Sequence, residues 1–182
     1  MIDKKKTQIE KLLQEFPLAQ YAYIRMEELE FSERVRYICE TECPRYDTSW
    51  ACPPAVGTLE ECQARCLSYE EGFLFTTFSE VPDIANLEET LTYRADHEEI
   101  TRQICGIFKE QGFEVMALST ESCAICDQCA YPHAPCRRPE YMFPCVESYG
   151  ILVTDLAEKY GIEFLYGGNV VTWFSLILLR ED

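Results

Sequence analysis

The hydrophobic positions of the N-terminal half follow helical spacing first and strand spacing next. Apolar residues at every third or fourth position predict a helix over residues 3–15. The aromatic, partly alternating segment Leu18–Met26 predicts a strand. A second helix is predicted over Thr58–Glu70, because Thr58 and Glu61 have the spacing of a capping box, which satisfies free N–H groups of the first turn.

The C-terminal half alternates apolar strands with longer helical stripes. Its predicted elements are a strand at Gly72–Phe78, a helix at Pro82–Gln111, a strand at Phe113–Ser119, a helix at Glu147–Tyr160 and a short strand at Phe164–Tyr166. The last segment, Val170–Leu179, is almost continuously apolar, which predicts a central strand buried on both faces. The elements together predict an α+β fold, with a mixed or antiparallel sheet of about four to five strands and helices packed on it.

Two cysteine-rich loops interrupt this pattern, and we expect both to belong to a single domain, residues 1–182. The second cysteine region, residues 120–146, contains the segment SCAICDQCAYPHAPCRRP. Its four closely spaced thiols are Cys123, Cys126, Cys129 and Cys136. A C-x2-C-x2-C run followed by a fourth cysteine is typical of a [4Fe-4S] cluster, in which each iron takes one thiolate. Zinc sites more often use two separated C-x2-C pairs, so the spacing favours iron–sulfur over zinc.

The first cysteine region, residues 33–57, has the spacing C-x3-C-x8-C at Cys39, Cys43 and Cys52. Its prolines and Gly57 exclude regular structure over most of the region, and a loop of this kind is typical of a chain wrapped on a metal centre. Three thiols on a cubane would leave one iron open to substrate. A fourth ligand is an alternative. Its candidates are Cys62, Cys66 and Cys145, which are otherwise small buried residues.

The net charge of the chain argues against two classes of binding partner. The chain carries 32 acidic and 16 basic residues, a net charge of −16, which argues against nucleic acids and anionic membranes as partners. The N-terminal segment lacks the apolar core of a signal peptide, and no apolar run reaches the roughly 20 residues of a membrane span. We therefore expect a cytoplasmic protein, whose eleven cysteines are thiolate ligands rather than a disulfide framework.

Both regions together resemble a cysteine-rich family of microbial proteins described only as predicted metal-binding proteins of unknown function. The first shared motif is C-x3-C followed by a tyrosine, a tryptophan and C-P-P, here Cys39, Cys43, Tyr46, Trp50 and Cys52-Pro53-Pro54. The second is C-x2-C-x2-C followed by C-R-x-P, here Cys123, Cys126, Cys129 and Cys136 to Pro139. The resemblance implies metal binding by these seven thiols, and it leaves Cys62, Cys66, Cys105 and Cys145 outside the shared set.

Three functions are compatible with these residues. The first is electron transfer, or reductive activation of a redox partner protein, by one or two [4Fe-4S] clusters. The second is an enzyme that binds a small-molecule substrate at the open iron of a three-cysteine cluster. The third is a zinc-stapled structural or interaction module. The sequence assigns no catalytic residues. His97 follows helical spacing toward the buried side, which indicates a core residue, and His133 within the second region is an alternative ligand.

Overall fold

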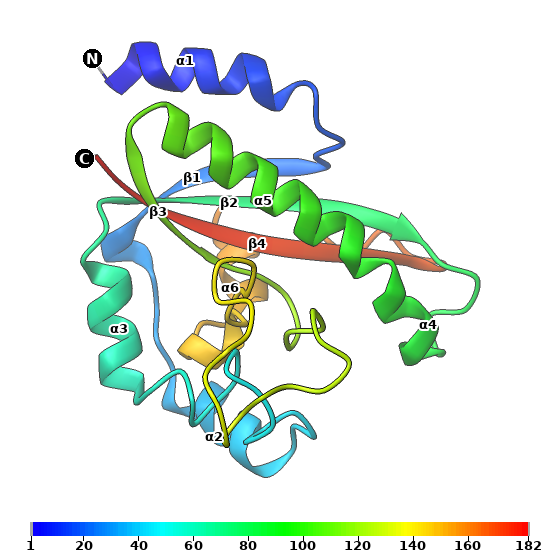
Figure 1. The fold of residues 1–182 in the computed structure, drawn as a ribbon. Coiled ribbons are helices and arrows are strands. Elements are labelled where there is room, and N and C mark those ends of the chain that lie inside the picture. The colour runs from blue at the N-terminus through cyan, green and yellow to red at the C-terminus, as the bar shows by residue number, and fades with distance from the viewer. Residues whose placement is uncertain (1, 182) are drawn as a thin grey trace.

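The structure is a computed structural model that describes residues 2–181, and it is an α+β fold built on one antiparallel sheet (Figure 1). The strands are β1 (Gln20–Arg25), β2 (Glu71–Glu80), β3 (Phe113–Leu118) and β4 (Val170–Glu181). The helices are α1 (Ile2–Leu13), α2 (Glu33–Thr41), α3 (Leu59–Leu67), α4 (Leu87–Thr92), α5 (Arg94–Glu110) and α6 (Val153–Lys159), with short 3₁₀ helices η1 (Met26–Glu28) and η2 (Glu147–Tyr149). The predicted fold class is confirmed.

The strand order is β1-β2-β4-β3, and every neighbouring pair is antiparallel. The last strand is therefore central, as its continuous apolar sequence predicts. Leu176 of β4 pairs with Leu74 of β2 on one side and with Leu118 of β3 on the other. All three leucines are fully buried, so the middle of the sheet is a continuous apolar row.

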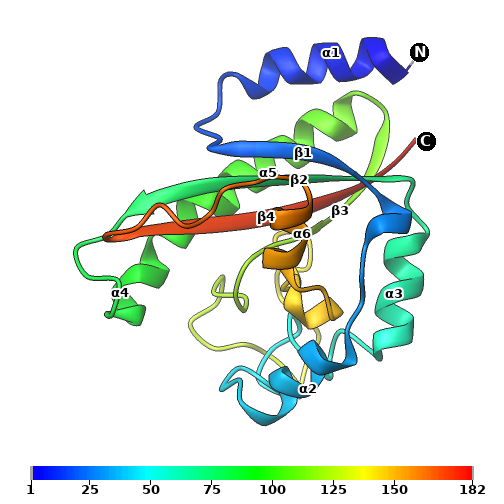
Figure 2. The same ribbon diagram turned by 180° about the vertical axis from the view of Figure 1, so that it is seen from behind.

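Helices cover both faces of the sheet, because successive strand residues point to opposite sides. One face packs on α1 and α5, and its buried residues include Ile9, Phe73, Phe75, Phe108 and Ile177. The other face packs on α3, α6 and η2, and its buried residues include Cys62, Leu74, Tyr149, Leu156 and Leu178. Helix α5 lies in front of the sheet in Figure 1, and α6 lies in front of it in Figure 2.

Three local predictions are corrected by the structure. The long helix over Pro82–Gln111 is two helices, because the Tyr93 N–H bonds to the Thr90 carbonyl and tightens the last turn of α4 before α5 begins. The helix over Glu147–Tyr160 is likewise interrupted, because Gly150 has a φ of +76° and cannot continue a right-handed helix. Phe164–Tyr166 is not a strand. The Phe164 carbonyl accepts a hydrogen bond from the side chain of Thr172 in β4.

Candidate metal centre

The two cysteine regions lie together on one side of the sheet. In both ribbon views the cyan and yellow segments lie below the strands (Figures 1 and 2). The second region starts directly after β3 and returns to it, because the Ser119 N–H donates to the Pro144 carbonyl and the Val146 N–H donates to Ser119. Ser119 and Cys145 thus form a parallel bridge that closes the second region at its base.

Helix α2 positions the first cysteine region. Cys39 lies on this helix, and residues 42–57, most of the region, have no regular structure, as expected. Arg36 fixes α2 in place: its guanidinium donates to the Ser148 carbonyl and to the Gly57 carbonyl, both at 2.8 Å. The loop then leads into α3 through the predicted capping box of Thr58 and Glu61, which the structure confirms.

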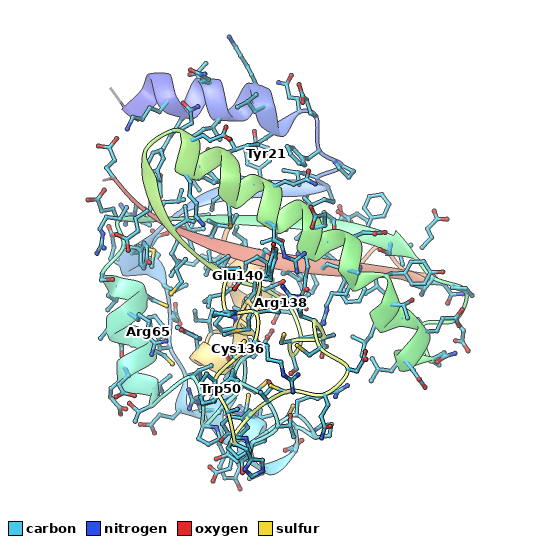
Figure 3. All side chains as sticks on the ribbon, viewed as in Figure 1. Tyr21, Trp50, Arg65, Cys136, Arg138 and Glu140 are labelled. Carbon is cyan, nitrogen blue, oxygen red and sulfur yellow. The ribbon has the colours of Figure 1, made fainter. Side chains whose placement is uncertain are left out.

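The four thiols of the second region line one small cavity. Its lining includes Cys123, Cys126, Cys129 and Cys136, together with Trp50 from the first region. Figure 3 labels Cys136 and Trp50 in this part of the molecule. The four cysteines therefore share one cavity, and their role as metal ligands stays a prediction.

Side chains of the first region hold the second region against this cavity. Trp50 Nε1 donates to the Ala134 carbonyl at 3.1 Å, and the Trp50 ring meets the Tyr131 ring edge-on at 5.0 Å. The Tyr131 hydroxyl donates to Asp47 Oδ1 at 2.5 Å. Ser49 and Ser122 hydroxyls are 3.2 Å apart. The two cysteine regions are thus one packed unit.

The surroundings of the cavity favour negatively charged sulfur. The Tyr131 N–H points at Cys129 Sγ at 3.5 Å, and N–H donors of this kind stabilise thiolates. Arg137 and Arg138 line the same cavity, and Arg137 also donates to the Gln128 carbonyl at 2.8 Å, which closes the loop. Burial raises the pKa of the Cys123 thiol, so this sulfur is protonated at neutral pH until a metal displaces the proton.

A larger cleft of about 1100 Å³ opens beside this cavity. Cys123 and Cys126 line both, so the four-thiol centre is reached from the surface. The cleft also contains the ion pairs that Glu98 forms with Arg94 and Arg102, at 3.6 and 3.2 Å. Its lining therefore combines these charged pairs with apolar side chains such as Leu87, Leu91 and Ile125.

Cys39 of the first region and Cys145 of the second both contact Glu147. Burial is the main cause that raises the pKa of Cys39 to about 11, and the neighbouring Cys43, Glu147 and Cys52 raise it further. Cys39 Sγ also donates to the Glu147 carbonyl at 3.9 Å. The Cys145 thiol donates to Glu147 Oε2 at 2.8 Å. From the sequence, Cys145 was only one of three candidates for a fourth ligand. Its only signal was its position at the end of the second region.

Among the residues that the structure describes, no three His, Cys, Asp or Glu side chains converge closely enough to hold a metal ion. The donor set nevertheless fits a thiolate-bound metal. Each cysteine region holds several cysteines, and none of the eleven cysteines, all within the described part of the chain, forms a disulfide. Metal ligation draws such protonated thiols together when it replaces their protons.

The other candidates lie in the hydrophobic core. Cys62 and Cys66 are fully buried among apolar residues under one face of the sheet, and Cys105 is buried under the other. His97 is also buried, as its helical position predicts. His133 is exposed and lines a neighbouring pocket with Cys136 rather than the four-thiol cavity.

Residues 22–179 match a family model described as "Predicted metal-binding protein (DUF2284)". The chain belongs to this family. The match spans both cysteine regions, and it confirms the resemblance that their motifs indicate. No curated protein and no solved structure matches the chain. In the described part of the chain, every helix is too short or too polar to cross a membrane.

Proposed function

We propose that the protein carries a [4Fe-4S] cluster on Cys123, Cys126, Cys129 and Cys136, and that this cluster serves electron transfer or reductive activation of a partner. The single observation that carries the proposal is the shared cavity: all four thiols line it. A cubane bound by four thiolates accepts and donates one electron at a time.

The surroundings support exchange of electrons with a partner. All four cysteines are partly exposed, so the centre lies near the surface. The N–H group of Tyr131 and the guanidinium groups of Arg137 and Arg138 stabilise negative charge on sulfur, and such contacts raise the reduction potential of a cluster. A low-potential carrier protein would supply one electron and an acceptor would take it, with no bond made or broken.

A second candidate is a single zinc ion that staples the two cysteine regions together. The observation in its favour is the size of the cavity, about 20 Å³, which suits a guest near the size of one water molecule. A cubane needs the loop to open outward, whereas a tetrahedral zinc ion needs only the sulfurs to close.

The deciding experiment is to measure iron, acid-labile sulfide and zinc per chain in protein purified without oxygen. We expect about four iron and four sulfide from this centre, lost in Cys129→Ser. Cys105→Ala is the matched control, because Cys105 is buried in the α5 layer and does not line the four-thiol cavity, and it should retain the metal. Zinc without sulfide would support the stapling function instead. Unchanged metal in Cys129→Ser would overturn the proposal.

A further inference from the structure

We infer that Cys145 completes a second four-thiol metal centre with Cys39, Cys43 and Cys52, separate from the centre in the second cysteine region. The inference rests on the proposed function only in assuming thiolate ligation of metal. It goes beyond the seven thiols of the two motifs, because it adds a ligand that lies outside them.

The backbone brings Cys145 to the first cysteine region. The Cys145 N–H donates to the Ala51 carbonyl at 3.3 Å, which places it beside Cys52. The parallel bridge to Ser119 at the end of β3 fixes the same residue to the sheet. Cys145 is therefore held between the core and the loop that carries the other thiols.

Two of the four side chains then contact the same residue. The Cys145 thiol lies 2.8 Å from Glu147 Oε2, and Cys39 Sγ lies 3.9 Å from the Glu147 main-chain oxygen. Cys43 follows Cys39 by four residues just after α2, and Cys52 is next to Ala51, whose carbonyl accepts from the Cys145 N–H. The chain thus brings the three segments that carry these four cysteines together near the start of η2.

This second group is distinct from the first. None of its four cysteines lines the cavity that holds Cys123 and its three partners. The two groups are joined by the contacts of Trp50 with Tyr131 and of Ser49 with Ser122. The arrangement is that of two neighbouring centres in one packed unit rather than one shared site.

Cys145 also differs from the cysteines of the core. Cys62 and Cys66 are fully buried in the apolar core, and the Cys62 thiol already donates to the Val56 carbonyl at 3.5 Å and accepts from Arg36 Nη1 at 3.7 Å. The Cys145 thiol instead faces the Glu147 carboxylate, and its backbone N–H is bonded to Ala51 of the first cysteine region. Of the three candidates for a fourth ligand, the geometry therefore selects Cys145.

The chemical consequence is a closed site. A centre with four protein thiolates has no open position for substrate, whereas one with three keeps an open position. The proposed ligand set therefore favours electron transfer or a structural role at the second centre, and it argues against an enzyme that binds substrate at an open iron.

The test uses the full chain, reconstituted without oxygen with ferrous iron and sulfide. We expect about eight iron per wild-type chain and about half of that in Cys145→Ser, or a three-iron cluster signal in its electron paramagnetic resonance spectrum. Cys39→Ser should give the same loss, Cys129→Ser should lose the other half, and Cys62→Ala should match wild type. Retention of half the iron shows that Cys145→Ser still folds.

A second measurement needs no variant. Thiol alkylation mapped by mass spectrometry should leave Cys145 unmodified in loaded protein and modify it after a chelator removes the metal. Wild-type iron in Cys145→Ser, or alkylation of Cys145 in loaded protein, would overturn the inference while leaving the first centre intact. If instead the proposed cluster on Cys123, Cys126, Cys129 and Cys136 is wrong, Cys129→Ser will retain all of its metal.

Discussion

His97 Nε2 lies 2.9 Å from the Ser175 hydroxyl, and His97 Nδ1 lies 2.8 Å from the Thr77 hydroxyl. Both ring nitrogens of this buried histidine are thus hydrogen-bonded within the core. Ser175 also bonds to Thr101 at 2.8 Å and to Ser119 at 3.3 Å. The polar network therefore joins α5 and the two central strands to the base of the second cysteine region.

This network makes stability depend on pH. Burial lowers the pKa of His97 from 6.5 to about 4. Between these values the unfolded chain binds a proton that the folded chain does not, so the free energy of unfolding falls as pH falls from about 6.5 to 4, by roughly 3 kcal/mol at the lower end. Urea unfolding at several pH values should show a steeper decline in wild type than in His97→Gln. Equal slopes would contradict this assignment.

Trp50 fluorescence should report metal binding at the centre formed by Cys123, Cys126, Cys129 and Cys136. Trp50 lines the four-thiol cavity, whereas the other tryptophan, Trp173, is buried in β4. An iron–sulfur cluster absorbs in the emission range of tryptophan, so loading should quench the Trp50 fluorescence. Trp50→Phe should remove most of this quenching, measured by titrating iron and sulfide into apoprotein. Equal fractional quenching in the variant would contradict the position of the cluster.

Gly72 should be intolerant of a side chain, and Gly106 offers the matched control. A Cβ on Gly72 would lie 2.5 Å from Cγ1 of Ile24 and 3.1 Å from Cδ1 of Leu176, both in the packed core. Gly72→Ala should therefore cost about 1–3 kcal/mol of stability. Gly106 lies in α5 with nothing within 4 Å of a new Cβ, so Gly106→Ala should stabilise the protein by up to about 1 kcal/mol.

Thermal or urea unfolding of the two alanine variants checks both signs in one experiment. A Gly72→Ala variant as stable as wild type would contradict the prediction. It would mean that the packing of β1 on β2 leaves space for a methyl group beside Ile24.

Local sequence patterns were sufficient where neighbouring residues decide the structure. The capping box at Thr58 and Glu61 was confirmed because both partners lie within one turn. The apolar run of β4 was confirmed as a central strand because a chain with no polar face needs cover on both sides. The break between α4 and α5 was missed, because the apolar stripe continues through Tyr93 while the backbone hydrogen bonds do not.

The sequence by itself determined the family and the candidate ligands of the four-thiol centre in the second cysteine region. Cys123, Cys126 and Cys129 are so close along the chain that few backbone paths can separate their sulfurs. Only the tertiary structure decided where Cys145 lies. Cys39 and Glu147 are 108 positions apart, and no local spacing predicts their contact. They meet because the bridge of Cys145 to Ser119 fixes the chain before η2, and the bonds of Ser32 to Gly150 and of Arg36 to Ser148 hold η2 against α2.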